Sequence, residues 1–119
     1  MNAHVHWLLE VDVKDGQIGA FKALMEEMVA ATQADEPGTL NYEWFFNDGE
    51  TVCHIYERYA DSAATMVHMG NFGSKFAQRF LSMVTPTRFS LYGAPDDTVR
   101  EALSGLAPQF YQQQAGFAR

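Results

Sequence analysis

Positive charge is scarce in this chain. Lysine and arginine together number 8, against 15 aspartates and glutamates, which gives a formal charge of −7. No segment gathers the basic residues into a cluster. Proteins that bind nucleic acid or anionic lipid present such a basic patch, so we expect no nucleic-acid partner and no membrane partner.

Cysteine and long apolar runs are equally scarce. Cys53 is the sole cysteine, which excludes an internal disulfide and a cysteine-based zinc site and is typical of a reducing compartment. Apolar runs are only a few residues long, and no basic segment followed by an apolar one stands near the first residue. We therefore expect no membrane span and no signal peptide, and a soluble, cytoplasmic protein.

Apolar and aromatic side chains are nevertheless abundant. Of the 119 residues, 47% are hydrophobic and 13% aromatic, which is enough for a substantial core in one domain. We expect residues 1–119 to form a single domain, with a core over about 4–93 and a C-terminal extension over 94–119.

Periodicity predicts the elements of this domain. Alternation of apolar and polar residues predicts strands, and helical spacing predicts helices. In chain order these are a strand at 4–13, a helix at 18–34, a hairpin of strands at 39–46 and 51–59, a helix at 62–69, a second helical piece at 72–83 after a break at Gly70-Asn71, a strand at 87–93 and a helix from Pro95 to Leu106.

The order βαββαβ is the ferredoxin-like α+β arrangement. We expect an antiparallel sheet with helices on one face. The other face of the sheet would expose a large half-apolar patch to water. A homodimer that packs sheet against sheet, as a dimeric α+β barrel, removes that exposure.

Strand parity places one carboxylate, Glu57, on an otherwise apolar strand face. On the strand at 51–59, Cys53, Ile55, Glu57 and Tyr59 share the face expected beneath the helices. On the first strand, the more apolar face carries Trp7 and Leu9. A carboxylate in such a place is either a catalytic group or one satisfied by structural partners, and parity leaves both interpretations of Glu57 open.

Several segments together resemble the antibiotic-biosynthesis-monooxygenase family, which includes quinol monooxygenases. They are Val13-Lys14-Asp15-Gly16, the run from Glu36 to Glu43, the run from Tyr56 to Asp61, and the run from Ala64 to His68. The resemblance spans residues 5 to 93. Family members usually carry Trp where Tyr59 stands and a His-Phe pair in the region where this chain has Asn71-Phe72.

The resemblance implies a fold and an activity. Several members oxidise phenols or hydroquinones with O₂ and without metal or flavin, in a pocket between the sheet and its helices. Such a reaction needs a base, hydrogen-bond donors for an oxyanion and a dry aromatic pocket. We therefore expect a cofactor-independent monooxygenase that acts on a small phenolic or quinol-type aromatic with O₂ as co-substrate. The expected catalytic residues are His68 as base, Glu57 and Tyr59, and the expected substrate-binding residues are Trp7, Leu9, Asn71, Phe72 and Phe76.

Other functions are compatible with the same residues. The dimeric barrel can be a non-catalytic module that binds an apolar metabolite, or an isomerase or cyclase that uses the same base without oxygen, because one scaffold carries many functions. Haem degradation is disfavoured, since the haem-degrading relatives use an Asn and a Trp where this chain offers Leu9 and Val67, and they use a later His, which this chain lacks after His68.

Two further features have open roles. His4, His6 and His54 share a strand face where three imidazoles can hold a metal, but no carboxylate is fixed beside them and we expect no metal site. In the extension, Phe110, Tyr111 and Phe117 are candidates to cover either the pocket mouth or a partner subunit.

Overall fold

The computed structural model describes residues 2–119 and contains the predicted βαββαβ order followed by a structured extension. The elements are β1 (Val5–Val13), α1 (Ile18–Asp35), β2 (Thr39–Phe46), β3 (Val52–Tyr59), α2 (Ser62–Lys75), α3 (Ala77–Met83), β4 (Val84–Gly93), α4 (Asp97–Leu103), the 3-10 helix η1 (Ser104–Leu106) and β5 (Gln109–Tyr111).

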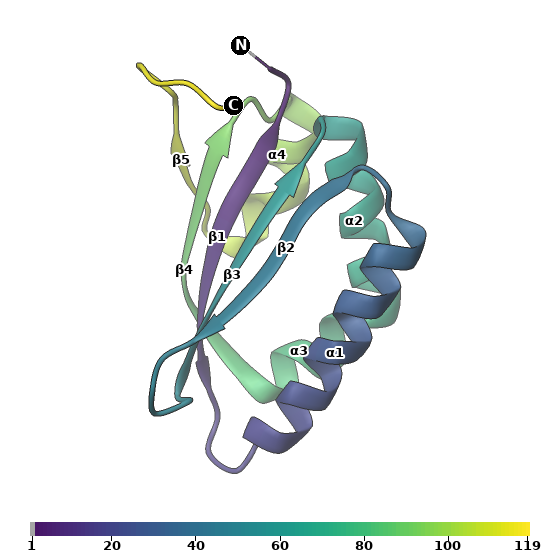
Figure 1. The fold of residues 1–119 in the computed structure, drawn as a ribbon, viewed down its shortest axis with the longest axis vertical. Coiled ribbons are helices and arrows are strands. Elements are labelled where there is room, and N and C mark those ends of the chain that lie inside the picture. The colour runs from purple at the N-terminus through teal and green to yellow at the C-terminus, as the bar shows by residue number, and fades with distance from the viewer. Residues whose placement is uncertain (1) are drawn as a thin grey trace.

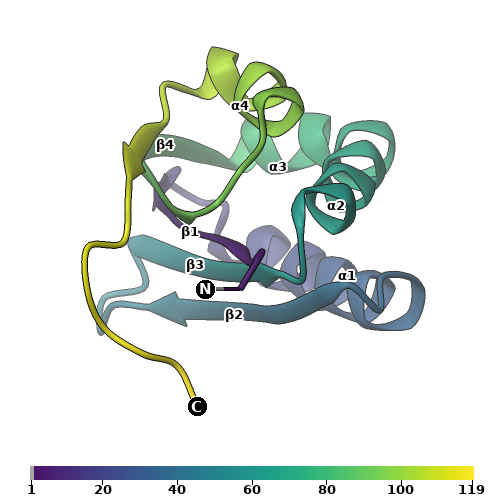
Figure 2. The same cartoon turned by 90° about the horizontal axis from the view of Figure 1, so that it is seen from above.

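The strands form one sheet in the order β2-β3-β1-β4-β5. All neighbours are antiparallel except β5, which runs parallel to β4. Figures 1 and 2 show the helices on one side of the sheet and the chain after β5 on the other side. The predicted α+β, ferredoxin-like fold is therefore confirmed, but the sheet is mixed rather than purely antiparallel.

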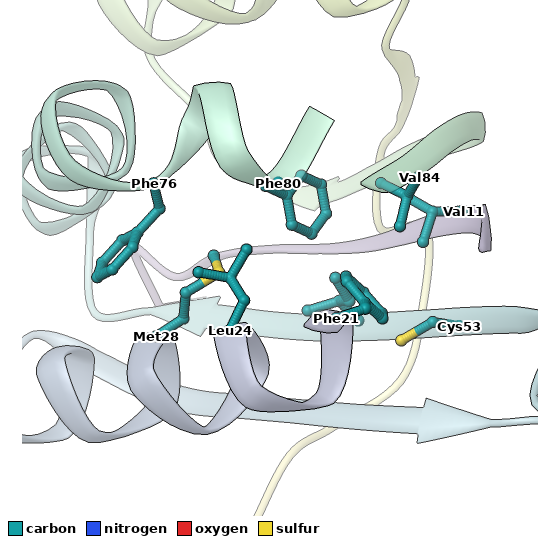
Figure 3. Packing of buried hydrophobic residues seen from close by; sticks show 9 residues of the cluster. Val11, Phe21, Leu24, Met28, Cys53, Phe76, Phe80 and Val84 are labelled. Atoms are coloured by element: carbon teal, nitrogen blue, oxygen red, sulfur yellow. The ribbon is translucent and has the colours of Figure 1, made fainter. Parts of the chain in front are cut away.

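The core fills the space between the helices and this covered sheet face, in two clusters. One cluster lies between α1, α3 and the strands, and Figure 3 shows Phe76 and Phe80 pointing toward Phe21, Leu24 and Met28 of α1. The second cluster lies under α4, whose Val99 and Leu103 are fully buried. The apolar residues that alternate along β1 and β3 supply the sheet side of both clusters, as period-two patterning requires.

The predicted break at Gly70-Asn71 is wrong, because α2 continues through it to Lys75. A glycine inside a helix costs only about 1 kcal/mol, and Asn71 gains a hydrogen bond to Glu36. The helical path bends instead at Phe76, where φ is −128° and ψ is −26°. Phe76 is 7% exposed, so the bend lets its ring enter the core between α2 and α3.

The last core strand also begins earlier than predicted, at Val84 rather than residue 87. Thr85 and Pro86 lie between the helical piece predicted at 72–83 and the strand predicted at 87–93, but in the structure they belong to β4. Pro86 pairs with Val11 where the register of β1 and β4 shifts between Glu10 and Val11. Proline lacks the N–H of a regular ladder and is tolerated at such irregularities, so the strand runs through it.

The extension is anchored to the core. Asp96 accepts a hydrogen bond from the Val99 N–H and begins α4, and β5 pairs with the edge of β4. The guanidinium of Arg100 lies 4.3 Å from the centre of the Phe110 ring. None of the described helices combines the length and the apolarity needed to cross a bilayer.

Candidate functional site

Glu57 lies on the covered face of β3, where parity placed it. The buried positions of this strand are Cys53, Ile55, Glu57 and Tyr59. Trp7 of β1 and Tyr42 of β2 stand directly opposite Glu57 in the two neighbouring strands. Glu57 is 5% exposed, so its carboxylate needs partners from the helices above.

His68 of α2 is the first of those partners. Asp61 caps the start of α2 by accepting a hydrogen bond from the Ala64 N–H, and His68 follows one helical turn after Ala64, facing the sheet. Its Nε2 lies 3.0 Å from Oε1 of Glu57, and its Nδ1 lies 2.8 Å from Oε1 of a second carboxylate, Glu36. His68 therefore stands between two buried carboxylates.

Glu36 was not predicted as a site residue. It directly follows α1, is 5% exposed, and accepts hydrogen bonds from Thr39 Oγ1 at 3.0 Å and from Asn71 Nδ2 at 3.1 Å. It lies between the helix predicted at 18–34 and the strand predicted from residue 39, in the turn that contains Pro37-Gly38. A turn residue has no periodicity to assign it a face, although Glu36 does lie in one of the segments that carry the family resemblance.

Close packing of this turn against α2 brings Glu36 to His68. A Cβ on Gly38 would lie 2.6 Å from the Cβ of Ala64, closer than side chains approach one another. The Gly38 carbonyl also accepts a hydrogen bond of 2.9 Å from the Ala60 N–H. Glycine at position 38 thus permits the contact that joins the end of α1 to the helix that carries His68.

The two carboxylates fix the protonation state of His68. Burial by itself lowers its pKa, but the hydrogen bonding and negative charge of Glu36 and Glu57 outweigh burial and raise the pKa to about 9. For Glu36, burial favours a higher pKa, yet His68, Asn71 and Thr39 together lower it. At neutral pH the ring of His68 is therefore an imidazolium between carboxylates.

Two neutral tyrosines lie against Glu57 and His68, and one of them, Tyr59, is hydrogen-bonded in the network. Tyr59 is fully buried, and its hydroxyl donates a 2.5 Å hydrogen bond to Oε1 of Glu57. Burial, followed by the charge of Glu57, raises the pKa of both Tyr59 and Tyr42. The ring of Tyr42 lies 5.3 Å from that of His68. Tyr42 was not predicted as a site residue, and its place on the covered sheet face follows from its pairing with Glu57 of β3.

One carboxylate oxygen of the network has no protein partner. Oε1 of Glu57 faces both Tyr59 and His68, whereas Oε2 has no hydrogen bond within residues 2–119. Among those residues, the fully enclosed side-chain polar atom that lacks a partner is Nε1 of Trp44. Oε2 of Glu57 is therefore not sealed in, and the open space beside it is the cavity that Glu57 lines.

This cavity has a volume of about 300 Å³. Of the residues expected at the site, Trp7, Leu9, Glu57, His68 and Phe72 line it. The rest of the lining is almost entirely apolar, and it consists of Met28, Tyr42, Ile55, Met69, Phe80, Leu81, Pro86, Phe89, Leu103, Gly105, Leu106 and Ala107. Apart from Glu57 and His68, no charged side chain of the described residues reaches this space.

Three residues expected at the site lie outside the cavity wall. The Tyr59 hydroxyl donates a hydrogen bond to Glu57, and the Asn71 amide donates one to Glu36. The Phe76 ring packs in the core next to α1. The first two belong to the network behind the cavity, so the structure brings them close to the site without exposing them to a ligand.

The strand-face histidines are engaged elsewhere. His4 Nδ1 lies 2.9 Å from Arg58 Nη1, His6 Nδ1 lies 3.2 Å from the Tyr56 hydroxyl, and His54 Nε2 lies 3.4 Å from Glu10. Across residues 2–119, no group of three or more His, Cys, Asp or Glu side chains is arranged to hold a metal ion.

Comparisons with known proteins identify relatives of this architecture. The crystal structure of MupZ from Pseudomonas fluorescens matches with a TM-score of 0.88 at 26% identity, over 100% of this chain and 91% of that one. SnoaB, a cofactor-independent oxygenase from Streptomyces nogalater, matches with a TM-score of 0.65 at 18% identity, over 79% of this chain and 95% of its own. Rv0793 from Mycobacterium tuberculosis matches with a TM-score of 0.67 at 19% identity, over 79% of this chain and 97% of that one.

No curated protein matches the chain. The family model described as antibiotic biosynthesis monooxygenase matches residues 5–79, which is more than half of the sequence and includes Glu36, Glu57 and His68. The chain belongs to the antibiotic biosynthesis monooxygenase family.

Proposed function

We propose that this protein is a cofactor-independent monooxygenase that oxidises a small phenolic or quinol-type aromatic with O₂. The observation that carries the proposal is the unpartnered Oε2 of Glu57 at the inner end of an apolar, aromatic-lined cavity. We infer that a ring binds there with its hydroxyl against this carboxylate. Membership of the family and the likeness to SnoaB, described as a cofactor-independent oxygenase, support the same activity.

Glu57 takes the role of base in this proposal. The sequence favours His68, but both ring nitrogens of His68 lie against carboxylates and a pKa of about 9 keeps the ring protonated at neutral pH. A protonated imidazole accepts no further proton. The carboxylate of Glu57 accepts the substrate hydroxyl proton at Oε2, while Tyr59 and His68 hold its other oxygen in place.

The remaining groups stabilise the anion that forms. When Glu57 takes the proton, the negative charge moves to the substrate oxygen, so the net charge of the site does not change. Both N–H groups of His68 are taken by carboxylates, so the imidazolium acts on this charge through its positive charge alone, and Tyr42, whose neutral side chain lines the cavity, supplies the hydrogen-bond donor in this proposal. In an apolar cavity such contacts are far stronger than in water, and the electron-rich anion can then reduce O₂.

Oxygen uptake with a panel of hydroquinones, naphthohydroquinones and simple phenols tests this function. We expect substrate-dependent O₂ consumption by protein purified without flavin and assayed with a chelator, and no product under anaerobic conditions. Product formation without oxygen would instead indicate an isomerase or cyclase. Saturable binding without turnover of any panel member would indicate a binding module.

We also infer that the protein forms a homodimer through the helix-free sheet face. That face carries Leu8, Tyr56 and Tyr92, and on it Phe45 is 55% exposed and Tyr111 is 44% exposed. Sedimentation equilibrium is expected to give twice the mass of one chain, and Phe45→Asp is expected to shift the protein toward the monomer. A wild-type monomer at micromolar concentration would refute this assembly.

A further inference from the structure

We propose that the start of the C-terminal extension determines which substrates enter, and that the preferred substrate is an aromatic ring with an unbranched apolar substituent. The ring lies against Glu57, and the substituent runs outward between Leu81 of α3 and Leu106 of η1. This inference rests on the proposed function only for the position of the ring. The specificity it describes concerns binding and does not depend on oxygen chemistry.

A burial gradient along the cavity gives the orientation. Glu57 and His68 are each 5% exposed, whereas Leu81 is 43% exposed and Leu106 is 47% exposed, and all four line the same cavity. The polar end is therefore deep and the open end is apolar. A ligand with a polar hydroxyl at one end and a hydrocarbon at the other matches this distribution.

The volume leaves room for more than a ring. A cavity of about 150 Å³ holds benzene, and this one measures about 300 Å³. About half of the space remains when one ring occupies the inner end, which is enough for about six further carbon atoms on the same scale. Trp7, Tyr42, Glu57 and His68 are the lining residues with polar side-chain atoms, so the side chains of Leu81 and Leu106 at the exposed end would not satisfy a polar substituent.

The extension supplies the outer wall on one side. Leu103, Gly105, Leu106 and Ala107 all line the cavity. Their position is fixed, because Leu103 is fully buried against the second core cluster and β5 is paired with β4 immediately afterwards. Ala107 lies between these anchors with φ of 53° and ψ of 51°, a backbone conformation that costs an alanine free energy and that the surrounding contacts must hold.

The extension residues that form this wall lie outside the part of the chain that matches the family model. The match to the family model covers residues 5–79 of this chain, and SnoaB matches 79% of the chain, whereas MupZ matches 100% of it. Phe110, Tyr111 and Phe117, the candidates to cover either the pocket mouth or a partner subunit, do not line the cavity. Leu106 is thus the large exposed side chain of the extension that a bound substituent would contact.

Binding of phenol, 4-propylphenol and 4-hexylphenol, measured by calorimetry without oxygen, tests the proposal. For the wild type we expect the dissociation constant to fall by about fourfold per buried methylene group. Leu106→Ala removes wall contacts and Leu106→Trp fills the outer half. Each is expected to raise the ratio of the 4-hexylphenol to the phenol dissociation constant, by about fivefold for alanine and at least about tenfold for tryptophan.

Leu40→Ala and Leu40→Trp are the matched controls, because Leu40 is 43% exposed and does not line this cavity. We expect the wild-type ratio in both. Equal ratios in the Leu106 and Leu40 variants, or a wild type that binds 4-hexylphenol no better than phenol, would overturn the proposal. Affinity that depends on chain length, without O₂ uptake, would support the specificity proposal and refute the monooxygenase function. O₂ uptake without chain-length dependence would support the monooxygenase function and refute the specificity proposal.

Discussion

Glu57→Gln is expected to lower kcat/KM for oxygen uptake by about 10² to 10⁴, the usual contribution of a positioned general base. Glutamine has nearly the same shape and keeps an oxygen that can accept the Tyr59 hydrogen bond. It offers no carboxylate oxygen to the cavity, so the substrate hydroxyl keeps its proton. The measurement is the initial rate of O₂ consumption with the best substrate of the panel.

Glu43→Gln is the matched control for this change. Glu43 is an exposed carboxylate on β2 that accepts a hydrogen bond from Asn41 and does not line the cavity. We expect wild-type rates for it. If Glu57→Gln folds, as judged by its thermal transition, and still consumes oxygen at the wild-type rate, Glu57 is not the base.

His68→Gln is expected to destabilise the protein by about 3 to 5 kcal/mol at pH 6, because it leaves two buried carboxylates without their cation. The effect depends on pH, since the pKa of His68 is raised from 6.5 to about 9 on folding. A raised pKa stabilises the folded state fully below about pH 6.5. This stabilisation declines as the pH rises and is gone once the pH has passed through 9.

The shift corresponds to about 3 kcal/mol between these limits. We therefore expect the free energy of unfolding of the wild type, measured by urea denaturation, to fall by about that amount more between pH 6 and pH 10 than that of His68→Gln. His54→Gln is the control, because His54 is 42% exposed and pairs with Glu10 at the surface, and it should retain the wild-type slope. Parallel pH profiles for the wild type and His68→Gln would contradict a protonated, carboxylate-bound His68.

Period-two patterning predicted the sheet faces because every second residue of a strand faces the core and is therefore mostly apolar. Glu57, Trp7 and Leu9 were placed correctly for this reason. The helical His68 was likewise expected over the sheet. Five of the residues that line the cavity, Trp7, Leu9, Glu57, His68 and Phe72, were therefore expected from the sequence, and the other twelve were not.

Local sequence pattern did not predict the contacts that hold His68 in its protonated form. Glu36 lies in a turn 32 positions before His68, and their contact depends on how closely Gly38 approaches α2. The continuation of α2 through Gly70-Asn71 has the same origin, since the Asn71 amide bonds to Glu36. β5 has three residues, too few to show a period, and it forms because β4 presents an unpaired edge.

The protonation state of His68 at neutral pH is the most direct test of this account. In spectra of protein labelled with ¹⁵N-histidine, with the signal assigned by its loss in His68→Gln, both ring nitrogens of His68 are expected to carry protons at pH 7. They are expected to titrate with a pKa near 9. A neutral ring at pH 7, with one bare nitrogen toward Glu57, would contradict the account and return the role of base to His68.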